Sequence, residues 1–180
     1  VNLVGILDAD SLLYFADFRV NERAFQMMQQ VSGRAGRKDG QGKVMIQVSN
    51  TQHPVIAFLL KHDYENFYAF EITARKELHY PPFTRIIKIS IKHKLDEVAS
   101  EAASRMAIGL QKNYQPYISG PAPAIIPRIR NRYIWELIIK LPKDMALIDQ
   151  CKKEIFQQAA ILFSYKRYAS ATIQPDVDPV

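Results

Sequence analysis

Apolar residues in the first fifty positions follow two different periods. A short continuous apolar run at Leu3–Leu7 predicts a buried strand of a parallel sheet. Asn21 offers an N-cap for a helix over Glu22–Val31, and Lys43–Val48 predicts a second strand. The apolar residues at helical spacing between the strands are Ala24, Met27, Met28 and Val31. A strand, a helix and a strand in this order form a right-handed crossover, so we expect the end of a larger α/β domain over residues 1–53.

The next segment, residues 54–80, predicts a helical connector. Its apolar and aromatic residues recur at helical spacing, and Asp63 marks a break between two helices. They include Ile56, Leu59, Leu60, Phe67, Phe70 and Leu78. Tyr80-Pro-Pro-Phe83 ends the helical structure, because proline disfavours the helical conformation for the residue before it. A second domain is therefore expected over residues 81–180.

The second half alternates between strand and helix patterns in the order βαββαβ. Strands are predicted where apolar and polar residues alternate, and helices where apolar residues recur every three or four positions. The expected elements are a strand at Ile87–Ile91, a helix at Leu95–Leu110, a short strand at Tyr117–Ser119, a strand at Tyr133–Lys140, a helix capped by Asp144, and a last strand at Ala171–Gln174. A long turn-rich segment begins at Gly120-Pro-Ala-Pro123. This order predicts an α+β split sandwich with both helices on one face of the sheet.

The composition is that of a globular chain, with 48% hydrophobic and 23% charged residues. No apolar run is long enough for a membrane span and no signal peptide precedes the first strand, so the sequence predicts a cytoplasmic protein without a membrane partner. Cys151 is the only cysteine, which excludes an internal disulfide and predicts a reduced thiol. The four histidines lie far apart, so we expect no metal site.

The formal net charge of +6 belongs to the second half of the chain. Residues 1–80 contain 9 Lys and Arg against 9 Asp and Glu, whereas residues 81–180 contain 15 against 9. A basic domain beside a neutral one is typical of a polyanion-binding module joined to another function, although modest positive charge is also common on ordinary soluble domains.

The segment Gln30-Val-Ser-Gly-Arg-Ala-Gly-Arg37 carries the most specific chemistry. Arg34 and Arg37 stand three apart in a glycine-punctuated turn after a helix, so their planar guanidinium groups can contact the oxygens of a γ-phosphate. Gln30 could orient water or a phosphate, and Gly33 ends the preceding helix. The alternative interpretation is a basic helix end with arginines exposed to solvent. We predict that Gln30, Arg34 and Arg37 are catalytic, and that Gly33 and both arginines bind the nucleotide.

Asp8, Asp10 and Asp17 form an acidic cluster after the first strand. No histidine or glutamate joins them at a fixed spacing, so we expect them to cap the strand end and the following turn rather than to bind a metal.

Arg128, Arg130 and Arg132 alternate through a proline-rich loop before the strand at Tyr133. Such a loop would present them outward on a semi-rigid arm, and we predict that they bind nucleic acid. Lys88 and Lys92 lie on the opposite strand face from the isoleucines and could extend the same patch, but a solvated face explains them equally well. Trp135 falls on the apolar face of its strand and is expected in the core.

Several of these segments together resemble one family. Gln-x-x-Gly-Arg-x-Gly-Arg resembles motif VI of superfamily 2 helicases, and the rest of the chain is similar to the primosomal protein N′ (PriA) family of replication-restart helicases. The segments that carry this resemblance are Leu7-Asp-Ala-Asp10, Phe15-Ala-Asp-Phe-Arg19, Glu22-Arg23, Tyr80-Pro-Pro-Phe83, Gly120-Pro-Ala-Pro123, Arg128-x-Arg-x-Arg-Tyr-x-Trp135 and Asp176-Val-Asp-Pro179.

The resemblance implies an ATP-dependent 3′-to-5′ DNA helicase that recognises stalled forks and promotes primosome assembly. Residues 1–53 would be the tail of a RecA-like motor lobe, and residues 81–180 a basic DNA-binding domain. ATP and Mg would act in the full-length enzyme, and zinc in a domain not present here, so we expect no cofactor in this fragment. The phosphate-binding loop (Walker A) and the Walker B acidic motif of the family are also not found in this sequence, so we expect the fragment alone to be inactive. Its partners would be forked or single-stranded DNA, primosome proteins and single-strand-binding proteins.

Two expectations concern the chain as it stands. It opens at Val1 within an apolar strand, which indicates a piece of a longer protein whose unpaired strand edges could pair between copies. The alternative function is a non-enzymatic RNA- or ribosome-binding module, because split βαββαβ sheets with basic loops also occur there. The segment from Gln30 to Arg37 favours the helicase, because an RNA-binding module needs no such residues behind a parallel strand.

Overall fold

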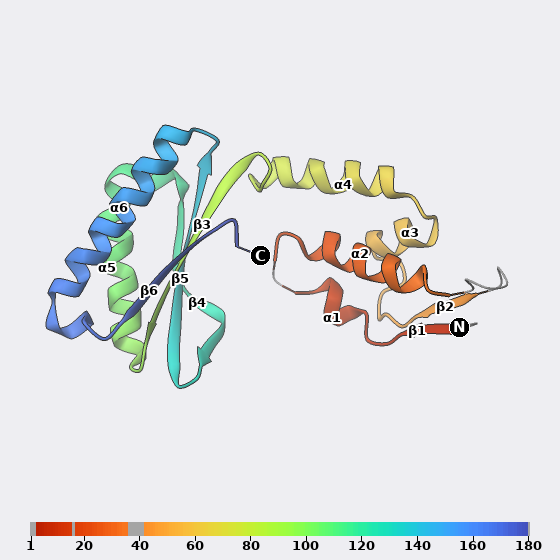
Figure 1. Ribbon diagram of the computed structural model, residues 1–180, viewed down its shortest axis with the longest axis horizontal. Coiled ribbons are helices and arrows are strands. Elements are labelled where there is room, and N and C mark those ends of the chain that lie inside the picture. Colours follow the sequence, from red (N-terminus) through yellow and green to blue (C-terminus); the bar gives the residue numbers. More distant parts are fainter. Residues whose placement is uncertain (1–2, 16, 36–41, 180) are drawn as a thin grey trace. The chain divides into compact units, whose positions relative to one another are not determined.

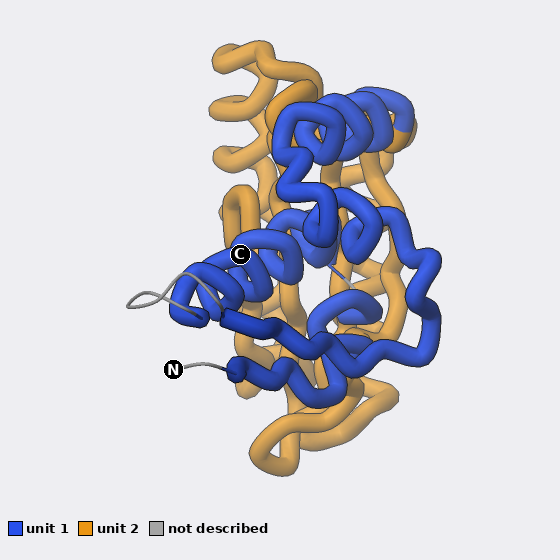
Figure 2. The backbone as a smooth tube through the Cα atoms, turned by 90° about the vertical axis from the view of Figure 1, so that its right-hand side faces the viewer, with its two compact units in different colours: residues 1–77 blue, residues 78–180 orange. Residues whose placement is uncertain are grey.

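The computed structural model describes residues 3–15, 17–35 and 42–179. The chain divides into two compact units, residues 1–77 and 78–180, which Figure 2 colours separately. Each unit has its own hydrophobic core. The helices of the predicted connector belong to the first unit, because their apolar residues Val55, Ile56, Leu59 and Phe67 are buried in its core. The division follows Glu77, three residues before Tyr80.

In its described residues, unit 1 combines a small parallel sheet with four helices (Figure 1). Its elements are β1 (Leu3–Ile6), α1 (Asp10–Leu13), α2 (Val20–Ser32), β2 (Lys43–Ile46), α3 (Pro54–Leu60) and α4 (Tyr64–Glu77). The strands β1 and β2 pair in parallel, from Leu3 opposite Lys43 to Ile6 opposite Ile46. The predicted strand, helix and strand are therefore present, and the break between α3 and α4 falls at Asp63 as expected.

Three details of unit 1 differ from the sequence prediction. The strand β1 is not buried: Leu3 is 54% exposed and the following Leu7 is 79% exposed. The buried face of α2 carries Phe25 rather than Met27, because Phe25 stacks on Phe67 of α4, with ring centroids 4.3 Å apart. Asn21 does not cap α2. It lies inside the helix, and its amide donates to Glu71 of α4.

Unit 2 is a four-stranded antiparallel sheet with two long helices. Its elements are β3 (Thr84–His93), α5 (Asp96–Tyr114), β4 (Ile118–Ile129), β5 (Arg132–Pro142), α6 (Met145–Ser164) and β6 (Thr172–Val177), with short 3₁₀ turns at Gln115–Tyr117 and Lys166–Tyr168. The strand order is β4-β5-β3-β6. Figure 1 shows α5 and α6 on the same face of the sheet, where they bury the isoleucines of β3. Asp144 caps α6, as predicted, by accepting from the N–H groups of Ala146 and Leu147.

The proline-rich segment after Gly120 is a strand, not the predicted loop. It forms most of β4, which lies at the edge of the sheet and pairs with β5 alone. An edge strand tolerates proline because one side of it needs no N–H donors. The last strand, β6, is likewise longer than predicted and includes Pro175, since it forms the opposite edge.

Within the described ranges, no helix is long and apolar enough to cross a membrane, and no group of three or more His, Cys, Asp or Glu side chains is placed to hold a metal ion.

Candidate nucleotide and nucleic-acid sites

The predicted nucleotide-binding residues lie at the C-terminal end of α2. Gln30 occupies its last turn, Gly33 is the C-cap residue, and the Arg34 N–H donates to the Val31 carbonyl in the turn that follows. Gln30 and Arg34 are both exposed. This end of the helix therefore brings Gln30, Gly33 and Arg34 together and leaves the two side chains accessible. Arg37, the second predicted arginine, lies outside the described residues.

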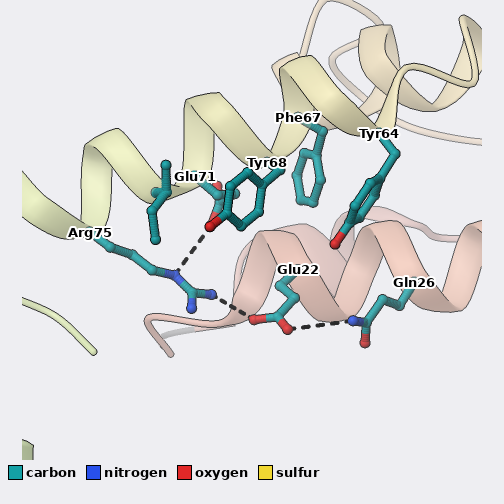
Figure 3. A pocket seen from close by; sticks show the side chains of 8 residues that line it. Glu22, Gln26, Tyr64, Phe67, Tyr68, Glu71 and Arg75 are labelled. Atoms are coloured by element: carbon teal, nitrogen blue, oxygen red, sulfur yellow. Dashed lines mark hydrogen bonds and ion pairs between the residues drawn. The ribbon is translucent and has the colours of Figure 1, made fainter. Parts of the chain in front are cut away.

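A partly buried network of ion pairs connects α2 with α4 (Figure 3). The Arg75 guanidinium donates to Glu22 Oε2 at 2.6 Å, and its Nε lies 4.0 Å from Glu71 Oε2. Only 15% of the Arg75 side chain is exposed, so these charges interact more strongly than a surface pair would. These three side chains also line a cavity of about 110 Å³ with Gln26, Tyr64, Phe67, Tyr68 and Ile72. The sequence pattern did not reveal Arg75, whose partner Glu22 lies 53 residues away.

The acidic residues after β1 have structural roles. Asp10 accepts from the Ser49 N–H at 2.8 Å, which ties α1 to the segment after β2. Asp17 accepts from the Arg19 N–H and pairs with Arg23 at 2.8 Å. Asp8 adopts a positive φ of 51°, and its carbonyl accepts from the Ser11 hydroxyl. Asp17 therefore caps its turn as predicted, whereas Asp10 binds the segment after β2 rather than capping the end of β1.

The arginines predicted to bind nucleic acid surround the tip of the β4–β5 hairpin. Arg130 and Asn131 form its two-residue turn with positive φ angles of 49° and 61°, as a type I′ turn requires. The Arg128 guanidinium lies 4.9 Å from the centroid of the Tyr133 ring and bonds to the Asn131 side chain. Arg132 donates to the Thr172 hydroxyl of β6 at 3.1 Å.

The three arginines do not lie on one face of the hairpin. Arg128 pairs with Tyr133, so it lies on the same face of the hairpin as that ring, whereas Arg132 precedes Tyr133 and lies on the opposite face. Arg130 stands at the turn between them. The hairpin tip therefore carries positive charge on both faces and at its end.

Lys88 and Lys92 lie on the face of the sheet that α5 and α6 leave open. The Lys88 ammonium stands 3.7 Å from Glu136 Oε1 of β5, and the Lys92 ammonium donates to Gln174 of β6 at 3.0 Å. Glu136 offsets part of the Lys88 charge. Trp135 lies on the other face of the sheet, the one that the helices cover, and packs against the core there as predicted. Its indole N–H donates to Asp96 at 2.9 Å.

Comparison with known proteins bears on both units. The family model of the primosomal protein N C-terminal domain matches residues 76–180. Three proteins named replication restart protein PriA are similar over most of the chain. The protein of Synechocystis sp. is 39% identical over 150 residues, that of Bacillus subtilis 38% over 169 residues, and that of Treponema pallidum 32% over 182 residues. The chain belongs to the PriA family.

These alignments cover 82%, 93% and 100% of the chain, but 18%, 20% and 27% of the three relatives. The chain thus spans between a sixth and about a quarter of the length of the PriA proteins that it matches. The family model covers all of unit 2, and the longer alignments extend through unit 1.

The terminal segment that resembles the PriA family has a clear structural role. Asp178 accepts from the Ile86 N–H at 3.0 Å through its side chain, while its own N–H donates to the Ile86 carbonyl at 2.7 Å. Arg85 pairs with the same carboxylate. The end of β6 is thereby fastened to the start of β3, so this segment holds the sheet edge in place.

Proposed function

We propose that the chain is the C-terminal part of an ATP-dependent, 3′-to-5′ replication-restart DNA helicase. Unit 1 would be the tail of its second, RecA-like motor lobe and unit 2 its DNA-binding domain. The observation that carries this proposal is the combination of a PriA-family unit 2 with the Gln30–Arg37 segment behind a parallel strand. The proposed partners of the longer protein are forked or single-stranded DNA, primosome proteins and single-strand-binding proteins.

The topology of both units supports the proposed fold assignment. The order β4-β5-β3-β6, with α5 and α6 on one face, supports a βαββαβ split sandwich for unit 2. The parallel pair β1 and β2, connected through α2, supports a motor-lobe tail for unit 1, and the exposed apolar side chains of β1 suit a strand covered by the rest of that lobe.

Arg34 and Arg37 are proposed to contact the γ-phosphate of ATP held mainly by the first lobe of the longer protein. The exposed position of Arg34 at a helix end fits this group, because a planar guanidinium can pair with two phosphate oxygens. Mg²⁺ would neutralise further phosphate charge, and the family's zinc would be held outside this chain. Gln30 would orient the attacking water.

Turnover of the longer protein tests this assignment. Replacing Arg37 by Ala should lower DNA-stimulated ATPase by about 10³-fold or more, the effect of an arginine finger, and leave DNA affinity nearly unchanged. Arg37→Lys should not restore it, because an ammonium lacks the planar fork. Lys61→Ala, which removes an exposed charge elsewhere in unit 1, is the control. Normal ATPase in the Arg37 variants would refute the finger, and normal ATPase with lost DNA binding would assign these residues to the DNA surface.

The hairpin arginines are proposed to bind DNA phosphates, with Lys88 and Lys92 extending the surface across the sheet. Between Ile118 and Trp135 the sequence contains three arginines and no acidic residue. Each phosphate contact should contribute about 0.9 to the slope of log affinity against log salt concentration.

This surface can be tested by removing the same charge at two places. Replacing Arg128, Arg130 and Arg132 by Ala should reduce the salt slope by about 2.7 for duplex DNA. Replacing Lys143, Lys152 and Lys153 by Ala lowers the net charge equally and should change the slope much less. Equal effects of the two triple variants would show that only net charge matters. A marked preference for RNA of the same sequence would favour the RNA-binding module.

A further inference from the structure

The edge strand β4 leaves its ladder just before the basic hairpin tip. Pro123 pairs with Trp135 and Arg128 pairs with Tyr133, so residues 124–127 of β4 stand opposite Ile134 alone. Figure 1 shows β4 swinging away from β5 in this region. We call this segment, Ala124-Ile125-Ile126-Pro127, the β4 bulge. A bulge directs its side chains away from the regular sheet surface.

The β4 bulge exposes two large apolar side chains beside the arginines. Ile125 is 68% exposed and Ile126 is 58% exposed, although isoleucine is usually among the most buried residues. Every residue from Ile125 to Asn131 is exposed. No acidic residue lies between Ile118 and Trp135, so the segment that carries this apolar surface contains arginines and no carboxylates.

A surface of this composition suits DNA at a point where bases are accessible. The arginines complement phosphates, which a continuous duplex and a branched DNA both present, and phosphate contacts carry no sequence information. Isoleucine and proline side chains are the kind that proteins insert between base pairs, and that insertion requires the bases to unstack. At a branch point the stack is already interrupted, so much of this cost is absent.

We propose that the β4 bulge is an apolar wedge that packs against the bases of an interrupted DNA stack, while Arg128 and Arg130 hold the flanking phosphates. This inference rests on the proposed DNA-binding role of unit 2 and adds to it the source of a preference for branched DNA. Ile125 and Ile126 distinguish the branch from a continuous duplex, and the arginines supply affinity for both.

The experiment compares two DNA probes with the 180-residue chain. One is a continuous duplex and the other a branched DNA of the same sequence, each with the fluorescent base 2-aminopurine at the branch position. We expect the wild-type chain to bind the branched probe about tenfold more tightly, which corresponds to about 1.4 kcal/mol, and to raise its 2-aminopurine fluorescence as the base unstacks. The double variant I125S/I126S should lose the preference and the fluorescence rise while binding the duplex within about twofold of wild type.

The matched control is I108S. Ile108 is 63% exposed on α5, so the control changes an equally accessible isoleucine away from the hairpin. It should keep the preference for branched DNA. The thermal midpoints of both variants should match that of the wild type, since all three side chains are largely solvated.

The outcomes separate this inference from the proposed function. A chain that binds neither probe at low salt would refute DNA binding by unit 2 as a whole. Salt-dependent binding with equal affinity for both probes, or a preference that survives in I125S/I126S, would overturn the wedge alone. Self-association of the wild type that I125S/I126S abolishes, without any change in branch preference, would also overturn it and assign the β4 bulge to a second copy of the chain.

Discussion

Alkaline pH should weaken unit 2 through its single thiol. Cys151 of α6 is fully buried in the core of this unit, and burial, together with the nearby Glu154 carboxylate, raises the pKa of the thiol from its ordinary value of 9.0 to about 11. In the unfolded chain the thiol ionises near pH 9, whereas in the folded chain it stays protonated. The stabilisation is fully present below pH 9 and is lost as the pH rises through 11.

The size of the effect follows from the two pKa values. A difference of two pKa units corresponds to about 3 kcal/mol in the free energy of unfolding, lost between pH 9 and pH 11. Tyr114 in the same core adds to this at higher pH, because burial raises its pKa from 10.0 to about 12, with Cys151 and Glu154 acting in the same direction. The variant C151V, which keeps an apolar side chain at the site, isolates the contribution of the thiol.

Fluorescence of Trp135 is the natural assay, because it is the only tryptophan and packs on the core of unit 2. Urea unfolding of wild type and C151V, measured at intervals from pH 8 to pH 11, gives the difference directly. Native alkylation provides a second measurement: at pH 8 the raised pKa reduces the thiolate of Cys151 about 100-fold, so labelling should require unfolding. If both proteins lose stability in parallel from pH 9 to pH 11, or if Cys151 reacts as a free thiol in the native state, the reasoning fails.

Three further predictions concern other parts of the chain. Replacing Arg75 by Met should lower the free energy of unfolding of unit 1 by about 2 kcal/mol, because it leaves Glu71 without its neighbouring cation. The control is K76M, at the exposed next position. An equal loss of stability in both variants would contradict the role of the ion network. Asp144→Ala should lower the free energy of unfolding of unit 2 by about 1 kcal/mol, because it removes the cap of α6, whereas Asp144→Asn should retain most of the stability. Unchanged urea midpoints would show that the cap is dispensable. The outer edges of the sheet formed by β1 and β2 should pair between copies at high concentration, and light scattering of a dispersed monomer with protected strand amides would argue against this.

The parts of the fold that the sequence predicts well are those whose pattern is local. The alternation around Ile89 predicts a central strand, and Asp144 predicts the start of α6, because each signal lies within the element itself. For the helix α2 the buried positions Ala24 and Met28 were predicted correctly, but Met27 was predicted in place of Phe25. The register of this helix depends on Phe25 stacking against Phe67, which lies 42 residues later, and no local period contains that contact.

The candidate site shows the same limit. Gln30, Arg34 and Arg37 are close in sequence, so their grouping needed no structure, and the hairpin arginines are grouped for the same reason. The distribution of the hairpin arginines over two faces follows from the pairing register of β4 with β5. The prolines of β4 hid that register, because they made the segment resemble a loop rather than a strand. Ile125 and Ile126 were missed because an apolar pair predicts burial, and only the register shift shows that both leave the ladder.

The pairing of β3 with β6 has a consequence for synthesis of the chain. The partners along these strands are separated by 80 to 90 residues, whereas β4 and β5 are joined by a two-residue turn. At translation rates of about 5 to 20 residues per second, β3 therefore emerges about 4 to 18 seconds before the strand that completes its edge. During that interval a central, isoleucine-rich strand lacks one neighbour and is open to pairing with other nascent chains. The Asp178 contact forms only when β6 docks, so it marks the step that ends this exposure.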